Sequence, residues 1–113
     1  MNILSDLYAA LSALDIPIET GVFKDEAPEK YIVFIPMVES FDLHADNSPG
    51  VEVQEVRLSL YAQGNYIKDK NAIVKAILAA DMTITDRRYI GYENDTGYHH
   101  YAVDVAQYYE MEE

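Results

Sequence analysis

The chain has 113 residues and a mass of 12.8 kDa, a length that fits one domain. Half of its residues are hydrophobic, enough for a core, and the absence of cysteine excludes disulfides and thiolate chemistry. Twenty acidic residues against eight basic ones give a formal charge of −12. Such a charge disfavours sequence-specific binding to nucleic acid and docking on anionic membranes, so we expect neither kind of partner.

The charged residues are distributed unevenly along the chain. Residues 31–56 and 89–113 contain no base. The acids in these two stretches are Glu39, Asp42, Asp46, Glu52, Glu55, Glu93, Asp95, Asp104, Glu110, Glu112 and Glu113. One interpretation is an ordinary solubilising surface. The other is a functional negative face, either a conduit past which DNA slides or a mimic of DNA.

Residues 2–14 have the pattern of an amphipathic helix. A leucine stripe recurs every three or four positions, and Ile3 and Tyr8 widen it. Asn2 is the expected cap, and Pro17 prevents the helix from continuing. A short strand is predicted over residues 18–23, followed by a polar connection over residues 24–29.

The most apolar stretch, residues 31–37, is predicted to be a strand because it is rich in β-branched and aromatic side chains. Its lack of alternation indicates burial on both faces. Pro36 cannot donate to a ladder, so we expect it near a strand end or at an unpaired edge. Residues 44–50, His-Ala-Asp-Asn-Ser-Pro-Gly, have the composition of a loop.

Residues 51–62 predict a long strand whose apolar pattern changes phase. The apolar residues occupy odd positions first and even positions later: Val51 and Val53, then Val56, Leu58 and Leu60. Since side chains alternate between faces, one regular strand cannot bury all five. A bulge near Gln54 and Glu55 is therefore expected.

A second helix is predicted over residues 68–80, with a buried stripe of Ile73, Ala76, Ile77 and Ala80 flanked by Val74 and Leu78. Strands over residues 88–93 and 98–109 follow, joined at Asn94-Asp95-Thr96-Gly97, where Gly97 is able to adopt a positive φ. In the last strand Tyr101, Val103 and Val105 are expected to share one face. This order predicts an α+β fold with a mainly antiparallel sheet, two helices packed on one face and a carboxy-terminal β-hairpin, in one domain over residues 1–113.

The sequence contains no phosphate-binding loop, dinucleotide fingerprint, helical His-Glu-x-x-His or nucleophile elbow. His99 and His100 are adjacent on a predicted strand, so they point to opposite faces and do not chelate one ion together. A composite metal site of one histidine with Glu93 or Asp95 is the remaining alternative. We expect no catalytic residue, no metal and no cofactor.

Tyrosine is unusually frequent, with ten in the chain and no tryptophan. Six of them lie in the final quarter: Tyr89, Tyr92, Tyr98, Tyr101, Tyr108 and Tyr109. Tyrosine joins a large apolar ring to a polar tip and is favoured where proteins meet. The carboxy-terminal strands are therefore either an interface or a sheet face half covered by rings.

Several segments together form a recognisable pattern. An amphipathic amino-terminal helix precedes a Tyr-Ile-Val-Phe strand and a Val-x-Val…Val-Arg-Leu-Ser-Leu-Tyr strand. An Asn-Tyr helix start and the ending Tyr-Glu-Asn-Asp-Thr-Gly-Tyr-His-His-Tyr-Ala-Val-Asp-Val follow. Over residues 4–109 this pattern resembles the small tail completion or tail terminator proteins of long-tailed bacteriophages and prophages.

The resemblance implies a structural virion protein that caps the tail tube and joins it to the head connector, typically as a hexameric ring and without catalysis. Its implied partners are the tail tube protein, the head connector protein and copies of itself. Its implied location is the head–tail junction of the virion, after assembly in the bacterial cytoplasm. The alternative is an acidic protein-binding module such as a DNA-mimic inhibitor.

Two segments are expected to form the contacts of such a ring. The first is a long loop over residues 38–50, since loops carry variable binding surfaces. The second is the tyrosine-rich hairpin. The interface candidates are Phe41, Asp42, Leu43, His44, Tyr92, Tyr98, Tyr101 and Tyr108.

Overall fold

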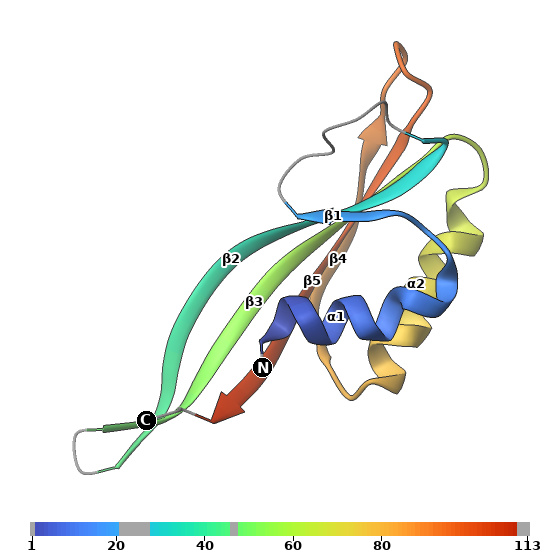
Figure 1. Ribbon diagram of the computed structural model, residues 1–113. Helices are drawn as coiled ribbons and strands as arrows, with labels where there is room; N and C mark the ends of the chain where they lie inside the picture. Colours follow the sequence, from blue (N-terminus) through green and yellow to red (C-terminus); the bar gives the residue numbers. More distant parts are fainter. Residues whose placement is uncertain (1, 21–27, 46–47, 111–113) are drawn as a thin grey trace.

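The computed structural model describes residues 2–20, 28–45 and 48–110, with the backbone alone for residues 38–45 and 48–50. The elements in chain order are α1 (Ile3–Leu11), a 3₁₀ turn (Ser12–Leu14), β1 (Ile18–Thr20), β2 (Lys30–Ala45), β3 (Ser48–Ala62), α2 (Tyr66–Ala79), β4 (Thr83–Tyr92) and β5 (His99–Glu110). The strands form one sheet in the order β1-β2-β3-β5-β4 (Figure 1).

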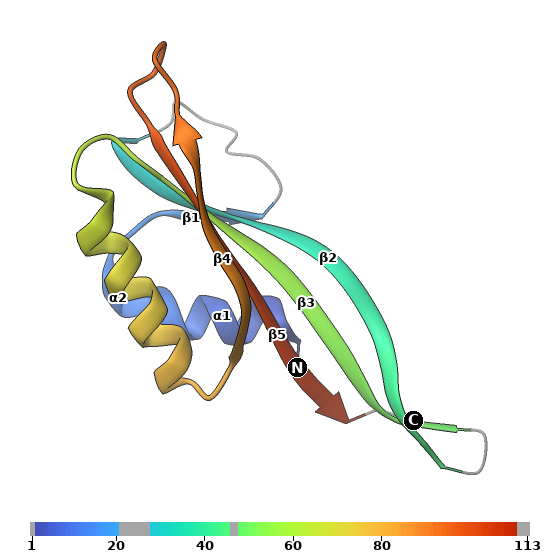
Figure 2. The same ribbon diagram turned by 180° about the vertical axis from the view of Figure 1, so that it is seen from behind.

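The sheet is mostly antiparallel, and only β1 pairs with β2 in parallel. Both helices lie on the same side of this sheet in the two opposite views of Figures 1 and 2. The predicted α+β fold is thus confirmed. Residues 21–23, the rest of the predicted first strand, and residues 24–27 of the polar connection lie outside the described residues.

The start of α1 is fixed by the predicted cap. The Asn2 side chain accepts a hydrogen bond from Ser5 N at 2.9 Å, and the Ser5 hydroxyl faces back to the Asn2 backbone, which completes a capping box. Ile3, Leu7 and Leu11 are buried as expected. Tyr8 is not part of the buried stripe, since 56% of its surface is exposed.

Helix α2 begins two residues before the predicted start because Asn65, not a later residue, caps it. The Asn65 Oδ1 accepts hydrogen bonds from Ile67 N at 3.1 Å and Lys68 N at 3.4 Å. Only a narrow stripe, centred on Ile73 and Ile77, is buried. The prediction was wrong for Ala80, which is exposed.

One hydrophobic core lies between the helices and the sheet. Its members come from both helices and from three neighbouring strands, and the largest fully buried ones are Phe34, Leu7, Leu11, Ile32, Leu58, Leu60, Ile73 and Ile77. Tyr101, Val103 and Val105 of β5 belong to this core, as their alternation predicted. Burying such side chains contributes about 1.5–3 kcal/mol each to folding.

The predicted loop over residues 38–50 is wrong. The strands β2 and β3 continue through almost all of it, and their register pairs Asp42 with Val51, His44 with Pro49 and Ala45 with Ser48. Residues 44–50 are rich in turn formers, but pairing in the long antiparallel ladder outweighs their low strand propensity. Pro49 lies next to the last pair of this ladder, Ala45 with Ser48, where a missing backbone N–H is tolerated.

The long strands make the molecule elongated. Its principal extents are 54 × 25 × 22 Å, and its radius of gyration is 15.4 Å. A compact domain of this length has a radius of gyration of about 13 Å. A strand of 16 residues such as β2 spans about 50 Å, so β2 alone accounts for the long axis.

The bulge is present, but on the neighbouring strand. The register between β2 and β3 shifts between Pro36 and Val38, whereas β3 pairs with β5 without interruption. Strand β3 instead keeps a regular alternation, in which Gln54 shares the helix-facing side of the sheet with Val56 and Leu58 and is 8% exposed. A polar residue inside the sheet face was not foreseen.

Pro36 lies beside this bulge on a strand that β1 covers only from Ile32 to Phe34. Ile35 and Met37 are 42% and 45% exposed. The prediction of burial on both faces therefore fails beyond Phe34. The physical reason is that β2 leaves the helix-covered part of the sheet there (Figure 1).

Strand β4 begins at Thr83, earlier than the predicted residue 88, and pairs antiparallel with β5. The connecting turn is closed by hydrogen bonds from Glu93 N to Tyr98 O at 2.9 Å and from Gly97 N to Glu93 O at 2.8 Å. Gly97 has the expected positive φ, +80°. Two register shifts, at Thr85 and Ile90, interrupt the outer edge of the sheet at β4.

Candidate assembly surfaces

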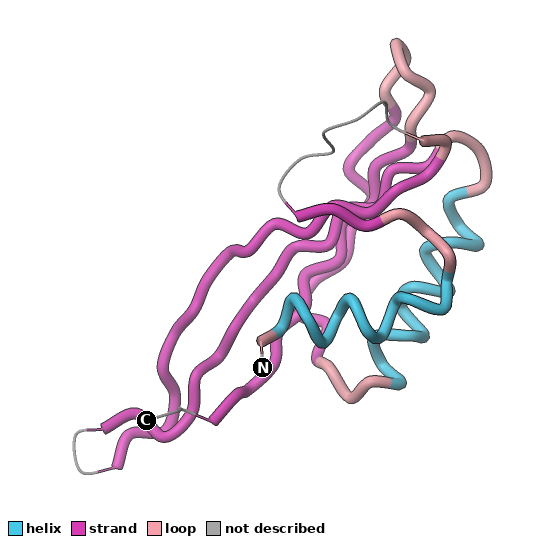
Figure 3. Tube along the Cα trace, viewed as in Figure 1, coloured by secondary structure: helices cyan, strands magenta, loops and turns pink. Residues whose placement is uncertain are grey.

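Residues 38–45 of β2 and 48–55 of β3 form the narrow end of the sheet, called the arm below (Figure 3). The arm is two-stranded at its tip, whereas β5 pairs with β3 over residues 51–55 at its base. From residue 35 onward, the described strands pair with β2 on its β3 side only. The other edge of β2 therefore presents backbone N–H and C=O groups to a neighbour. The arm contains four acids and no base: Glu39, Asp42, Glu52 and Glu55.

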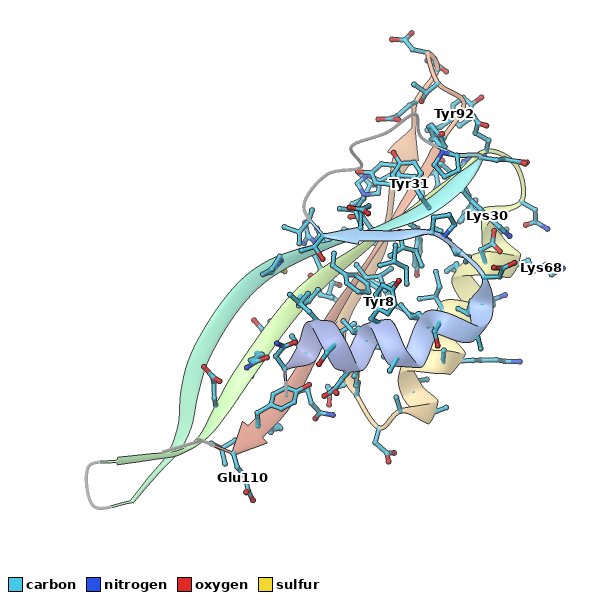
Figure 4. The ribbon with its side chains drawn as sticks, viewed as in Figure 1. Tyr8, Lys30, Tyr31, Lys68, Tyr92 and Glu110 are labelled. Carbon is cyan, nitrogen blue, oxygen red and sulfur yellow. The ribbon has the colours of Figure 1, made fainter. Side chains whose placement is uncertain are left out.

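At the other end of the molecule, Tyr66, Tyr89, Tyr92 and His99 form a group that we call the tyrosine patch. Ring centroids lie 5.2 Å apart for Tyr66 and Tyr89, and 4.8 Å apart for Tyr92 and His99. The Tyr89 hydroxyl lies 2.9 Å from His99 Nδ1. Tyr89 remains 45% exposed, and Tyr92, which is labelled in Figure 4, remains 52% exposed, so both rings are available to a protein partner.

A second aromatic group lies on the sheet face opposite the helices. Tyr31, Tyr61 and His100 are register partners on β2, β3 and β5, and their rings stack with centroids 4.9 Å and 4.3 Å apart. Tyr98 packs edge-on against Tyr31 at 5.4 Å, and its hydroxyl donates to Pro28 O at 2.5 Å. This row ties three strands together across the sheet.

Burial changes the titration of these rings. It raises the pKa of Tyr31 and of Tyr61, because the phenolate is the charged form. It lowers the pKa of His100, because the imidazolium is the charged form. The nearby Glu93 carboxylate acts in the opposite direction on His100, with a smaller effect. His100 is therefore held toward its neutral state.

Two ion pairs occupy the same sheet face. Arg57 forms a bidentate pair with Asp104, with Nε–Oδ1 and NH2–Oδ2 distances of 2.9 and 3.2 Å, and this hydrogen bonding raises the pKa of Arg57. Arg88 hydrogen-bonds Asp86 and lowers the pKa of that carboxyl. Two acids of the sheet are thus neutralised locally.

A cavity of about 370 Å³ lies where the start of α1 meets the bulge of β2. Gln54 borders it, but its side chain is already used: Oε1 accepts from Ile3 N at 2.9 Å, and Nε2 donates to Glu52 at 3.0 Å. The walls are otherwise formed largely by Ile3, Pro36 and Met37 and their neighbours. This hollow suits an apolar side chain.

Among the side chains that the structure describes, those of residues 2–20, 28–37 and 51–110, no three His, Asp or Glu gather closely enough to hold a metal ion. His99 and His100 do lie on opposite faces, one against Tyr89 and the other against Tyr61. Among the described helices, none is both long and apolar enough to cross a membrane.

The interface candidates fall into three groups. The backbones of Phe41, Asp42, Leu43 and His44 lie in the arm, in β2 rather than in a loop, and their side chains lie outside the described part. Tyr92 and Tyr108 are exposed, at 52% and 58%. Tyr98 and Tyr101 are 7% and 8% exposed, so both rings belong to the packing of the chain itself.

Three members of the tyrosine patch, Tyr66, Tyr89 and His99, were missed as interface candidates. Tyr89 was counted in the tyrosine-rich final quarter, but Tyr66 stands apart in sequence. Only the packing of α2 beside β4 and β5 brings them together. The Asn-Tyr pair at the start of the helix drew attention to Tyr66, but nothing in the sequence indicated that Tyr66 contacts Tyr89 and His99.

Comparison of the chain with models of known protein families found no match, and neither did a search of curated proteins.

Proposed function

We propose that the protein is a structural component of a bacteriophage or prophage virion that caps the tail tube and joins it to the head connector by ring assembly. The observation that carries this proposal is the arm, because it gives a small chain a long projection with a backbone edge that no described strand pairs. The sequence resemblance to tail terminator proteins supports the same function.

A closed ring requires two different surfaces on each subunit, since each copy contacts one neighbour with one surface and the next neighbour with the other. The arm and the tyrosine patch lie at opposite ends of a molecule whose longest extent is 54 Å. A subunit of this shape is able to reach two neighbours at once. The patch supplies rings of the kind enriched at protein interfaces.

The charge of −12 suits a passage for DNA. A ring lined by carboxylates repels phosphates, so DNA passes through it without binding. Acidity also suits the alternative, an acidic module that occupies the DNA-binding surface of another protein. Genetic context separates these two functions.

The test is to sequence the DNA that flanks this reading frame. Connector genes on one side and a tail-tube gene on the other are the expected result, and purified tubes then become the binding partner to assay. Flanks without virion genes would contradict the proposal and would favour the acidic module.

A further inference from the structure

The outer surface of α2 is basic, although the chain as a whole is strongly acidic. The helix contains Lys68, Lys70 and Lys75 and one acid, Asp69, which pairs with Lys30 at 3.3 Å. Lys70 lies over the ring of Tyr101 at 5.5 Å. Lys68 and Lys75 are exposed, and among the described residues neither forms an ion pair.

The same surface exposes apolar side chains. Ile67 and Leu78, near the two ends of α2, are 50% and 55% exposed. Lys68 and Lys75 lie between them, about 10 Å apart along the helix axis. We call these four residues the α2 face. All four side chains are exposed in the part of the chain that the structure describes.

A complementary surface lies at the base of the arm. Glu55 pairs with Ala106 of β5, and Tyr108 and Glu110 follow at alternate positions, so all three lie on the face opposite the helices. Tyr108 is 58% exposed and Glu110 is exposed. We call this group, Glu55, Tyr108 and Glu110, the arm-base patch. Its two acids are separated by about 13 Å along the strand direction.

We infer that the α2 face binds the arm-base patch of a second copy of this chain. Lys68 and Lys75 face Glu55 and Glu110 across the contact, because the two pairs have similar spacing and opposite charge. Tyr108 lies midway between the two acids along β5, so its ring packs on α2 between the two lysines, beside the exposed Asn71. This inference rests on the proposed function, since it specifies one of the contacts by which the ring assembles.

The contact forms between copies and not within one. Lys68 and Glu110 lie at opposite ends of the molecule in Figure 4. Each copy therefore binds one neighbour through its α2 face and another through its arm-base patch, which generates a ring or a filament. Copies with a net charge of −12 repel each other elsewhere, so the lysines also select the orientation of approach.

Charge reversal tests this contact. The face variant carries Lys68→Glu and Lys75→Glu, and the arm variant carries Glu55→Lys and Glu110→Lys. Each variant alone is expected to self-associate at least about tenfold more weakly than the wild type in sedimentation velocity at low salt, because like charges then meet. An equimolar mixture is expected to restore assembly, since each variant complements the other. Restoration also shows that both variants are folded.

Matched controls reverse charges outside the contact. Arg87→Glu on β4 and Asp95→Lys in the β4–β5 turn are exposed positions and are expected to leave assembly unchanged. Wild-type assembly is expected to weaken as salt is raised, because exposed pairs are screened beyond about 10 Å at 0.1 M. A mixture of the two variants that remains as weakly associated as either alone would overturn the inference.

Disulfide trapping covers the case of weak association, since the chain has no cysteine of its own. An Asn71→Cys, Tyr108→Cys chain is expected to form a ladder of cross-linked oligomers on oxidation, with or without tail tubes, because both positions are exposed and lie at the centre of the contact. Monomers under both conditions would overturn the inference. Tubes that are capped normally by the face and arm variants would overturn this contact alone, whereas tubes that the wild type leaves bare would overturn the proposed function.

Discussion

Gln54 is expected to stabilise the protein through a single long-range contact. Its side chain is 8% exposed, and its Oε1 accepts a buried hydrogen bond from Ile3 N at 2.9 Å, 51 residues away. Ile3 N is one of the four N–H groups at the start of α1 that no helical carbonyl reaches. Gln54 therefore joins the amino-terminal helix to the middle of β3.

The test substitution is Gln54→Met, which preserves length and removes both polar atoms. An unpaired buried N–H costs about 1–3 kcal/mol. The adjoining cavity of about 370 Å³ admits water, which offsets part of this cost. We expect a loss of about 1–2 kcal/mol in the free energy of unfolding, from a total of about 5–15 kcal/mol.

Urea unfolding followed by circular dichroism measures this loss, and the midpoint is expected to fall by about 1 M. The matched control is Gln107→Met, because Gln107 is the register partner of Gln54 on β5 and its hydrogen bonds are solvent-exposed. The control is expected to stay within about 0.5 kcal/mol of the wild type. Equal midpoints for the wild type and Gln54→Met would refute the role of this contact.

Four further outcomes are expected. Leu58→Asp places an unpaired charge at a fully buried position and should abolish the folded circular dichroism spectrum; a normally folded variant would contradict the assignment of β3. Tyr109→Phe removes the hydrogen bond from the Tyr109 hydroxyl to Asp6 Oδ2 at 2.6 Å and should cost about 1 kcal/mol in urea unfolding, whereas an unchanged midpoint would show that the bond contributes nothing. Burial lowers the pKa of His100 in the folded state below the unfolded value of about 6.5. The stability contributed by neutral His100 is therefore complete above that pH and is lost as the pH falls. His100→Phe should flatten the pH dependence of the free energy of unfolding between about pH 7 and 5.5, and an equally steep profile for this variant would count against the role of His100. Shortening the arm by removing residues 43–50 and closing it with an Asn-Gly turn should leave the fold intact but block head–tail joining, and infectious particles at normal yield would exclude a role for the arm.

The sequence predicted the elements that depend on local patterns. The Asn2 cap, the buried Leu7 and Leu11, and the inward Tyr101, Val103 and Val105 follow from helical or strand periodicity, and the structure confirms them. These features depend on neighbours within a few positions. Local pattern is therefore sufficient to identify them.

The failures concern contacts between distant residues. Residues 38–50 were predicted to be a loop because residues 44–50 are rich in turn formers. Pairs such as Asp42 with Val51 depend on strand register rather than on composition. The bulge was placed on β3 because an inward glutamine was not considered. Gln54 is tolerated there only because Ile3 N and Glu52 satisfy its amide.

The candidate surfaces were predictable in part. The acid run of the arm follows from the sequence. Of the four tyrosines predicted to lie at an interface, Tyr92 and Tyr108 are exposed, whereas Tyr98 and Tyr101 are buried. The tyrosine patch required Tyr66 to meet Tyr89 and His99, which is a consequence of helix packing. The periodicity of a single helix or strand does not predict a contact between side chains of different elements.

Electron microscopy of tail tubes mixed with the purified protein shows whether the protein caps a tube. Tubes are assembled from the tail-tube protein of the same virion and are incubated with the wild type or with the arm-shortened variant. We expect a ring of protein at one end of each tube and an arrest of tube growth with the wild type only. Bare tube ends and continued growth in the presence of the wild type would contradict the proposed function.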